Sequence, residues 1–285
     1  PEAITMFGIN DDEIPGRELL YLCKNAGNRK NEEEWNNLRE WFHVNNNNSA
    51  RLKKAAAYHE DEMDRTPLHL LLYLCEPPVD VIETFIEYTP EVLQIKTKLG
   101  SLPLHMVCRH CKSIKAVSLL VAAYPDGSTV ADHGGLLPLH CACFYHASIE
   151  VLNLLVEAYP ESINIISRSK QTPSAIMKEI YGKRQCKFLL HRVCSGGYSY
   201  HLAKLALEAF PKNGMKQDEY GMVPLHHACA HACNNVYSLR LIHFLMQAYP
   251  KSKIVQDNDR NTPLHYLNKR ASLIDERGML LLHRE

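Results

Sequence analysis

Histidine and cysteine side chains recur at short spacings along the chain, and these residue types can bind metal ions or carry out thiol chemistry. The chain has 285 residues, of which 16 are histidine and 10 are cysteine. Two trios lie at helical spacing: His105, Cys108 and Cys111, and His226, Cys229 and Cys233. A structural zinc site closes a tetrahedron of four ligands, so each trio would need a fourth ligand, such as His110 or His231. A metal- or redox-responsive protein that uses these clusters is therefore one hypothesis for the function.

Nucleophilic catalysis by a cysteine is a second chemistry to consider. A catalytic thiolate needs an exposed electropositive cleft and an oriented base. Four cysteines follow a histidine by three residues: Cys108, Cys143, Cys194 and Cys229. This repetition favours packing over one active site, because a buried cysteine behaves as a small apolar side chain. Since the common phosphate-loop, zinc-protease and serine-hydrolase motifs are also missing from the sequence, we predict a protein that is not an enzyme and needs no cofactor.

The charge balance argues against nucleic acid as the partner. Lysine and arginine total 32, and aspartate and glutamate also total 32. A protein that binds nucleic acid by neutralising phosphates needs a strong basic excess, which this chain lacks. Hydrophobic residues make up 46% of the chain, enough to bury a sizeable core. A folded protein without a nucleic-acid partner is therefore expected.

The sequence shows neither a membrane span nor a secretion signal. The longest apolar stretch, 68–75, is far shorter than the roughly 20 residues that a spanning helix needs. Residues 1–20 carry acidic groups where a signal peptide would have a basic start and an apolar run. Ten cysteines without an export signal indicate reduced thiols, so we expect an intracellular protein, cytoplasmic or nuclear. The chain begins at Pro1, as a part of a longer polypeptide would.

Two short phrases repeat with one period and define the elements that position the histidines and cysteines. The first phrase, Pro-Leu-His, begins at Pro67, Pro103, Pro138, Pro224 and Pro263. Partial copies lie at 172–173, which lacks Leu-His, and at 189–191, which lacks the proline. The second phrase is an aromatic residue before proline: Tyr124-Pro125, Tyr159-Pro160, Phe210-Pro211 and Tyr249-Pro250. From Pro67 to Pro173 the prolines are 36, 35 and 35 residues apart, which indicates a repeat architecture.

Each period predicts two helices and an extended turn. Proline suits the first turn of a helix, where its missing N–H is not needed, and Thr66, Thr172 or Thr262 can cap that helix. After a polar break, a second helix carries apolar residues at helical spacing, as in 149–158, until the proline of the second phrase stops it. The remaining residues carry turn signals, as in 132–135. One unit is therefore predicted as helix, turn, helix and extended turn.

The repeated phrase resembles that of ankyrin-repeat proteins, Asp-x-x-Gly-x-Thr-Pro-Leu-His-x-Ala. Residues 218–228 match it at every fixed place except the threonine, and residues 132–142 match about as well. The resemblance covers roughly residues 61–285. The period is nearer 35 than the usual length of about 33 residues, and the Tyr-Pro ending is similar to ankyrin proteins of diatoms and related algae. The resemblance implies an all-α fold, an ankyrin-repeat solenoid of helix-turn-helix units with β-hairpin-like turns.

The resemblance also implies structural roles and a domain organisation. In the family, the histidine of the phrase bridges its own turn to the neighbouring unit through both ring nitrogens. Six histidines hold this place: His69, His105, His140, His191, His226 and His265. We expect an ankyrin-repeat domain at 65–285, with an irregular or partial repeat around 169–188. Residues 1–64 are predicted to be an N-terminal helical capping region with helices at 16–25 and 32–43, the second with an apolar stripe of Trp35, Leu38, Trp41 and Phe42.

The function implied by the resemblance is that of a protein-protein interaction scaffold, which binds another protein through the concave face of the solenoid. That face is made by the turn tips and the exposed ends of the first helices. The turn tips supply Lys98, Leu99, His133, Leu136, Tyr220, Met222, Asp259 and Asn261. The helix ends supply Tyr73, Arg109, His110, Phe144, Tyr145, His231, Lys269 and Arg270. Aromatic and arginine side chains dominate the binding energy of many interfaces. An alternative for Phe144 and Tyr145 is packing between units. The sequence does not indicate an oligomeric state.

Overall fold

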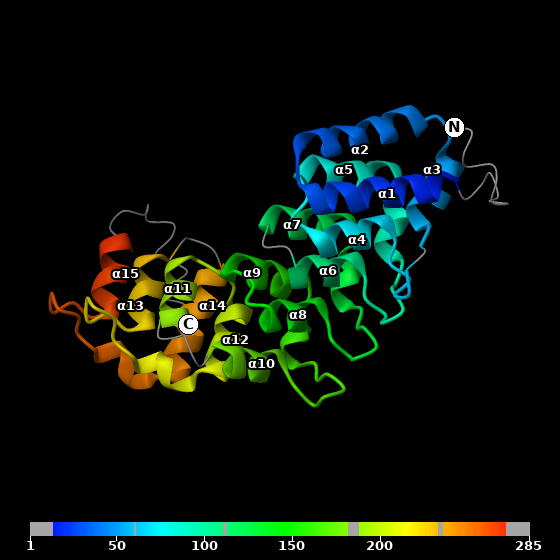
Figure 1. Ribbon diagram of the computed structural model, residues 1–285. Helices are drawn as coiled ribbons and strands as arrows, with labels where there is room; N and C mark the ends of the chain where they lie inside the picture. The colour runs from blue at the N-terminus through cyan, green and yellow to red at the C-terminus, as the bar shows by residue number, and fades with distance from the viewer. Residues whose placement is uncertain (1–13, 60, 111–112, 182–187, 233–235, 272–285) are drawn as a thin grey trace. The chain divides into compact units, whose positions relative to one another are not determined.

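The computed structural model describes residues 14–59, 61–110, 113–181, 188–232 and 236–271. The chain divides into two compact units, residues 1–171 and 172–285. The described residues form fifteen α-helices and short 3-10 helices, and none of them is assigned to a strand (Figure 1). The fold of the described part is therefore all-α, as predicted. None of the helices described is long and apolar enough to cross a membrane.

The first unit contains two rows of helices. The first row is α1 (Ile14–Arg29), α4 (Pro67–Leu74), α6 (Pro103–His110) and α8 (Pro138–Phe144). The second row is α2 (Glu32–Asn45), α5 (Val79–Tyr88), α7 (Ile114–Ala123) and α9 (Ile149–Ala158). Each helix contacts the next in its own row, as Figure 1 shows for α1, α4 and α6. The buried apolar side chains of each repeat therefore lie against the neighbouring repeats, and the core is continuous along the unit.

The second unit repeats this packing with one irregularity. Its helices are α10 (Pro173–Tyr181), α11 (Leu189–Ser195), α12 (Tyr200–Ala209), α13 (Pro224–Ala230), α14 (Val236–Ala248) and α15 (Pro263–Ala271). The helices α11, α13 and α15 contact one another in sequence, and α12 contacts α14. The irregularity lies at α10 and α11. Both helices start a repeat, but α11 follows α10 among the described helices, and α10 packs on α12. Residues 182–187 of the predicted irregular repeat lie outside the described residues.

The helices begin where the sequence supplies caps. Proline is the first residue of α4, α6, α8, α13 and α15, and the Thr66 hydroxyl accepts the N–H of His69 at the start of α4. Three second-row helices begin after a serine whose hydroxyl accepts a backbone N–H: Ser113, Ser148 and Ser199. Such a cap stabilises a helix by about 1 kcal/mol. The helix starts predicted from the prolines of the repeat phrase are therefore observed, and α11, whose partial phrase lacks the proline, starts at Leu189.

The proline of the second phrase does more than stop a helix. After α9, the N–H of Tyr159 still donates to Leu155, and Pro160 then starts the 3-10 helix η4 (Pro160–Asn164). The same element follows the other second helices: η2 (Pro90–Gln94), η3 (Pro125–Thr129), η6 (Pro211–Met215) and η7 (Pro250–Ile254). The sequence pattern predicted only an extended turn at these places, so the 3-10 helices were not expected. Because proline fixes φ near −65°, it is compatible with the first turn of a helix as well as with the end of one.

The buried histidines join one repeat to the next. Nε2 of His105 donates to the carbonyl of Leu136 at 3.0 Å, and its Nδ1 accepts the N–H of Leu102 at 3.1 Å. Nε2 makes the equivalent bond, to the carbonyl two places before the next repeat phrase, in His69, His191 and His226. Nε2 of His140 bonds instead to the carbonyl of Ile165, directly after η4. All five side chains are at most 4% exposed. His265, the last copy, is exposed and accepts only locally, from Thr262. Nε2 therefore bonds forward in five of the six copies, and the expected role through both ring nitrogens is observed in four, because Nδ1 of His191 has no hydrogen-bond partner among the described residues.

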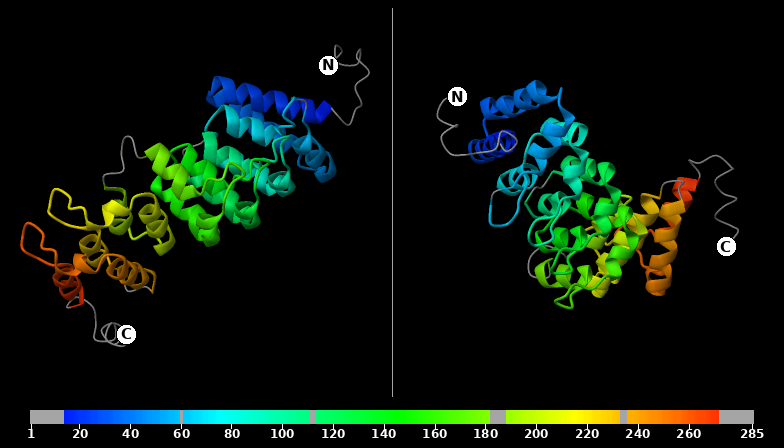
Figure 2. Two further views of the ribbon diagram at one scale, coloured as in Figure 1. Left: turned by 90° about the horizontal axis from the view of Figure 1, so that it is seen from below. Right: turned by 90° about the vertical axis from the view of Figure 1, so that its right-hand side faces the viewer.

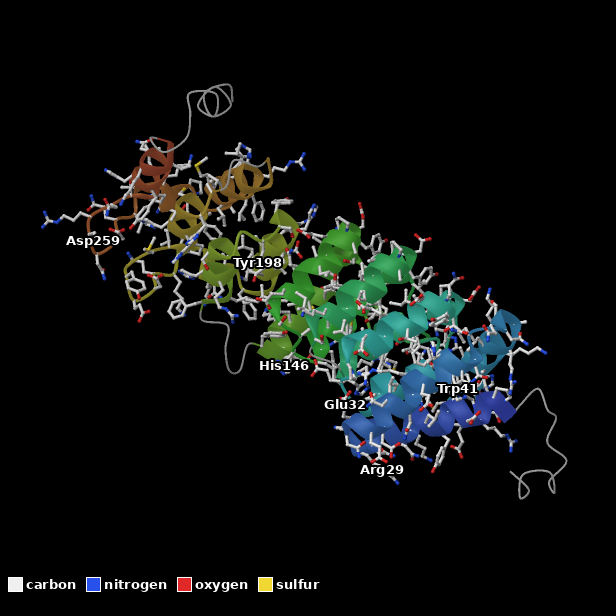
Figure 3. The ribbon with its side chains drawn as sticks, turned by 90° about the horizontal axis from the view of Figure 1, so that it is seen from above. Arg29, Glu32, Trp41, His146, Tyr198 and Asp259 are labelled. Atoms are coloured by element: carbon white, nitrogen blue, oxygen red, sulfur yellow. The ribbon has the colours of Figure 1, made fainter. Side chains whose placement is uncertain are left out.

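The N-terminal region packs on α4 and α5 within the first unit. The helices predicted at 16–25 and 32–43 are present as the longer α1 and α2. The predicted apolar stripe of α2 is buried, and the rings of Phe42 and Phe85 lie 4.8 Å apart. The indole N–H of Trp41, labelled in Figure 3, donates to Glu18 of α1. A third helix, α3 (Ser49–Ala57), was not expected; it begins after Asn48, whose side chain accepts the N–H of Arg51.

Candidate functional site

The turns before the first helices share one polar anchor. The residue six places before the start of the repeat phrase is Asp61, Thr97, Asp132, Ser167, Asp218 or Asp257. Its side-chain oxygen accepts at least one backbone N–H of its own turn in every case. Oδ1 of Asp132, for example, accepts the N–H of Gly134 at 2.8 Å and that of Leu136 at 2.9 Å. Each turn tip is therefore held by its own side chain, since no helix or strand satisfies these donors.

Neighbouring turn tips also bind each other through the backbone. An N–H of one tip donates to a carbonyl of the preceding tip: Lys98 to Met63, His133 to Leu99, Arg168 to Gly134, and Asn258 to Tyr220. Figure 2 shows the last two turns, which precede α13 and α15, projecting side by side, and Asp259 marks the tip of the last one in Figure 3. Gly100 has a φ of +77°, and a Cβ there would lie 2.7 Å from the His133 ring. A glycine is therefore needed where the next tip packs closely.

Arg109 binds the turn of the next repeat. Its Nη2 donates to Oδ2 of Asp132 at 2.6 Å, its Nη1 to Ser101 at 3.2 Å and its Nε to the sulfur of Cys141 at 3.4 Å. The two side chains of the ion pair are only 14% and 6% exposed. The predicted contact residue Arg109 therefore orients Asp132, and through it the tip that carries His133 and Leu136.

We expect replacement of Arg109 with leucine to lower the free energy of unfolding by about 2–3 kcal/mol. The change leaves the buried Asp132 carboxylate without its cation, a loss that costs about 3–5 kcal/mol when both partners are fully buried. Urea denaturation followed by circular dichroism measures the change. The matched control is Arg51→Leu, because Arg51 is an exposed arginine on α3, where we expect a change within about 0.5 kcal/mol. Equal stability of the two variants would contradict this role for Arg109.

A row of aromatic rings crosses three successive repeats of the first unit. The rings of Tyr73 and His110 lie 4.8 Å apart at their centroids, and those of His110 and Tyr145 lie 5.9 Å apart. Phe144 extends the row at 5.2 Å from Tyr145. The side chains of Tyr73, Tyr145 and Phe144 are 45%, 47% and 52% exposed. We call these four residues the aromatic row, and exposed apolar patches of this kind mark interaction sites.

A pocket of about 440 Å³ lies along the aromatic row. It is lined by Tyr73, His110 and Tyr145 of the row, by Leu99 and Arg109, and by Met63, Arg65, Thr97, Ser101 and Met106. The guanidinium carbon of Arg65 lies 4.5 Å from the centre of the Tyr73 ring, a cation–π contact. Five of the predicted contact residues are therefore brought together in one concave site: Tyr73, Leu99, Arg109, His110 and Tyr145.

Arg65 lines this pocket but is not among the contact residues predicted from the sequence. It lies two places before the repeat phrase, the turn position that is filled by Leu136 and Met222 in other repeats. Both of those residues were predicted as contacts, so alignment of the repeats was the signal that could have found Arg65. Leu136 and Met222 themselves are half-buried, and their carbonyls accept hydrogen bonds from His105 and His191.

The predicted contacts of the second unit are more dispersed. Tyr220 is 62% exposed at a turn tip, His231 is exposed at the end of α13, and Lys269 is exposed on α15. The side chain of Arg270 lies outside the described residues. A pocket of about 280 Å³ in this unit is lined by other residues: Phe188, His191, Arg192, Ser195, Asp218, Glu219 and His227. None of the predicted contacts of the second unit lines this pocket.

Asp218 in this second pocket is held as a turn anchor. Its Oδ2 lies 2.7 Å from Nε2 of His227. Burial alone would raise the pKa of Asp218, but hydrogen bonds from His227 and from the backbone N–H groups of Met222 and Tyr220 outweigh it and lower the pKa below its ordinary value. Asp218 is therefore bound by a side chain of its own repeat, whereas Asp132 is bound by Arg109 of the preceding repeat.

The cysteines of the described chain are buried and poorly suited to thiol chemistry. Burial raises the pKa of Cys75 to about 11 and that of Cys229 to about 12, and it raises the pKa of Cys143 and Cys194 as well. A thiol with a raised pKa stays protonated at neutral pH and is a weak nucleophile and metal ligand. In the residues that the structure covers, no three His, Cys, Asp or Glu side chains are grouped to hold a metal ion. Two members of the trios considered above, Cys111 and Cys233, lie outside those residues.

The predicted tip residues Lys98 and His133 remain exposed beside the pocket. Their backbone N–H groups bind the preceding tips, which leaves both side chains at the surface of the first unit. The site is thus a face of turn tips and helix ends, with one pocket that contains both aromatic and cationic groups. No protein-family model matches the chain, and a search of curated proteins finds no match either.

Proposed function

We propose that this chain is an ankyrin-repeat solenoid that serves as a non-enzymatic scaffold and binds another protein through its turn tips and first helices. Three features support the family: the recurring phrase, the histidine that bonds to the next turn, and the stacked turns held by Asp, Thr or Ser. In such a solenoid the turn tips and first helices would form a concave face suited to an extended protein surface. An intracellular setting, cytoplasmic or nuclear, fits the many buried free thiols.

The observation that carries the proposal is the aromatic row. Its exposed rings come from three successive repeats and lie next to a pocket rather than being scattered over the surface. Tyrosine and phenylalanine offer large contact areas at a small loss of side-chain freedom, and they are frequent in the centres of interfaces. The alternative function, a metal- or redox-responsive protein, has weaker support because the described thiols are buried and have raised pKa values.

We expect the double substitution Tyr73→Ala and Tyr145→Ala to abolish capture of the partner with little loss of stability. Both side chains are nearly half exposed, so their removal leaves the core intact. Affinity capture from a cell extract with the purified chain, followed by quantitative mass spectrometry, measures the proteins retained. The expected result is at least one protein that the wild-type chain retains and the double variant loses.

A control variant distinguishes the effect of removing the aromatic row from the effect of removing exposed apolar side chains elsewhere. Val44 on α2 is 65% exposed and Ile254 in η7 is 78% exposed, and neither belongs to the aromatic row. The variant with both of these replaced by alanine should retain the same proteins as the wild type. If the two double variants recover identical sets of proteins, the aromatic row is not the binding face.

A further inference from the structure

Arg65 is oriented for a ligand that the described residues do not supply. Its guanidinium lies over the Tyr73 ring, and its Nε donates to Asp61. Within the described part of the chain, neither Nη group of Arg65 has a hydrogen-bond partner. A guanidinium fixed on an aromatic face presents its two Nη groups in a plane, which matches the geometry of a carboxylate. Arg65 therefore offers a prepared site for an anionic group.

The other charges of the pocket have the same sign. Arg109 and His110 line it together with Arg65, and none of the residues that line it is acidic. Asp61 accepts from Nε of Arg65 and Asp132 accepts from Nη2 of Arg109, but neither carboxylate lines the pocket. A cationic ligand would find no counter-charge here, and a purely apolar ligand would bury the Nη groups of Arg65 without partners. Charge complementarity therefore favours an anionic ligand with apolar surface.

His110 adds a group that responds to such a ligand. Its ring lies between Tyr73 and Tyr145, and within the described residues it makes no hydrogen bond. Burial lowers the pKa of His110, and the positive charges of Arg109 and Arg65 lower it further. A carboxylate bound beside these three side chains would reverse part of this effect. Binding would then take up a proton, and the affinity would rise as the pH falls.

We infer that this pocket binds an acidic peptide segment of a partner protein, with an aspartate or glutamate carboxylate on Arg65 and an adjacent aliphatic or aromatic side chain against Tyr73 and Tyr145. This inference rests on the proposed function and specifies the partner chemistry at the same site. The peptide lies along the aromatic row, so its apolar side chains cover rings that are exposed in the free chain. The carboxylate supplies the acceptor that the Arg65 Nη groups lack.

Selection from a random dodecapeptide library displayed on phage tests the inference on the intact chain. We expect the selected peptides to be enriched in aspartate or glutamate next to leucine, proline or an aromatic residue. A fluorescent copy of the strongest peptide should lose about tenfold or more in affinity when its acidic residue is changed to the corresponding amide. Selected peptides with no acidic preference, or an amide copy that binds equally well, would overturn the inference.

Variants of the protein show whether Arg65 is the receptor of the carboxylate. Arg65→Gln should weaken the selected peptide about tenfold or more, and Arg65→Lys should weaken it as well, because lysine keeps the charge but lacks the planar fork. Arg51→Gln, at an exposed arginine of α3, is the matched control and should bind as the wild type does. Thermal melting of each variant confirms that it is folded. Unchanged binding by both Arg65 variants would contradict the assignment.

The pH dependence of peptide binding provides a second readout. Between pH 7.5 and about 5.5 the affinity of the wild type should rise by up to about tenfold, and His110→Gln should remove this rise. A flat profile for the wild type would place the carboxylate away from His110 and contradict the inference. Neutral peptides that depend on Tyr73 and Tyr145 would overturn the inference but leave the proposed function intact. The proposed function fails by a different result, which is that the proteins captured from extract bind the Tyr73 and Tyr145 double variant as well as they bind the wild type.

Discussion

Replacing His105 with alanine should lower the free energy of unfolding by about 4 kcal/mol. The imidazole is fully buried, accepts the N–H of Leu102 and donates to the carbonyl of Leu136 in the next repeat. Alanine would leave both backbone groups buried without partners, at about 1–3 kcal/mol each, and would open a cavity between the repeats. Urea denaturation followed by circular dichroism measures the loss.

His265→Ala is the matched control, because this histidine holds the same place in the repeat phrase. Its side chain is exposed, and its Nδ1 bonds only to Thr262 of its own turn. We expect its replacement to lower the free energy of unfolding by no more than about 1 kcal/mol. If the two variants lose similar amounts of unfolding free energy, the stabilising effect of this histidine does not depend on its burial or on its bond to the next repeat.

The stability of the folded chain should fall by about 6 kcal/mol as the pH is lowered from 6.5 to 4. Burial lowers the pKa of both His69 and His105 to about 4, although their hydrogen bonds to Ser101 and Leu136 oppose this shift. Since the unfolded value is about 6.5, the unfolded chain binds these protons more readily between the two values. The stability that comes from keeping these two imidazoles neutral is therefore present above about pH 6.5. It is lost as the pH falls from 6.5 through 4, where the folded chain also binds the protons. Each contributes about 3 kcal/mol to the change.

Unfolding free energies measured in urea at pH 7, 5.5 and 4.5 test this dependence. The variant His69→Gln should be less stable than the wild type at pH 7 and should show a shallower decline with acid, because glutamine does not titrate. His265→Gln, at the exposed copy, should leave the decline unchanged. A wild-type stability that is constant over this range, or that rises with acid, would contradict the assignment of neutral buried imidazoles.

The sequence predicted the helices best where a single residue type has one physical meaning. Proline before Leu-His marks the start of α4, α6, α8, α13 and α15, since few other places in a helix accept a proline. The apolar stripe of α2 was also recognised, because helical spacing alone identifies a buried face. The helix α3 was missed because the asparagine run before it suggested only a loop, although Asn48 in that run is its cap.

The site was predicted less completely, because spacing along the chain does not show what a side chain reaches. Arg109 was expected to contact a partner, yet its guanidinium binds Asp132, which lies 23 residues further along. The same limit applies to Tyr73, His110 and Tyr145, whose meeting in one row depends on the packing of α4, α6 and α8. The repeat alignment indicates which residues hold equivalent places in the turns and helix ends, while the contacts between repeats decide which of these side chains remain exposed.

The histidine contacts also bear on how such a chain can lengthen during evolution. Each imidazole recognises only a backbone carbonyl of the next turn, an acceptor that every residue type provides. A duplicated segment of one period would therefore bring its own histidine and its own acceptor, and it would fit between existing repeats without compensating changes elsewhere. Insertion of a segment in register would be accommodated easily, whereas a change of length within one repeat would disturb the order of the helices, as where α11 follows α10 although α10 packs on α12.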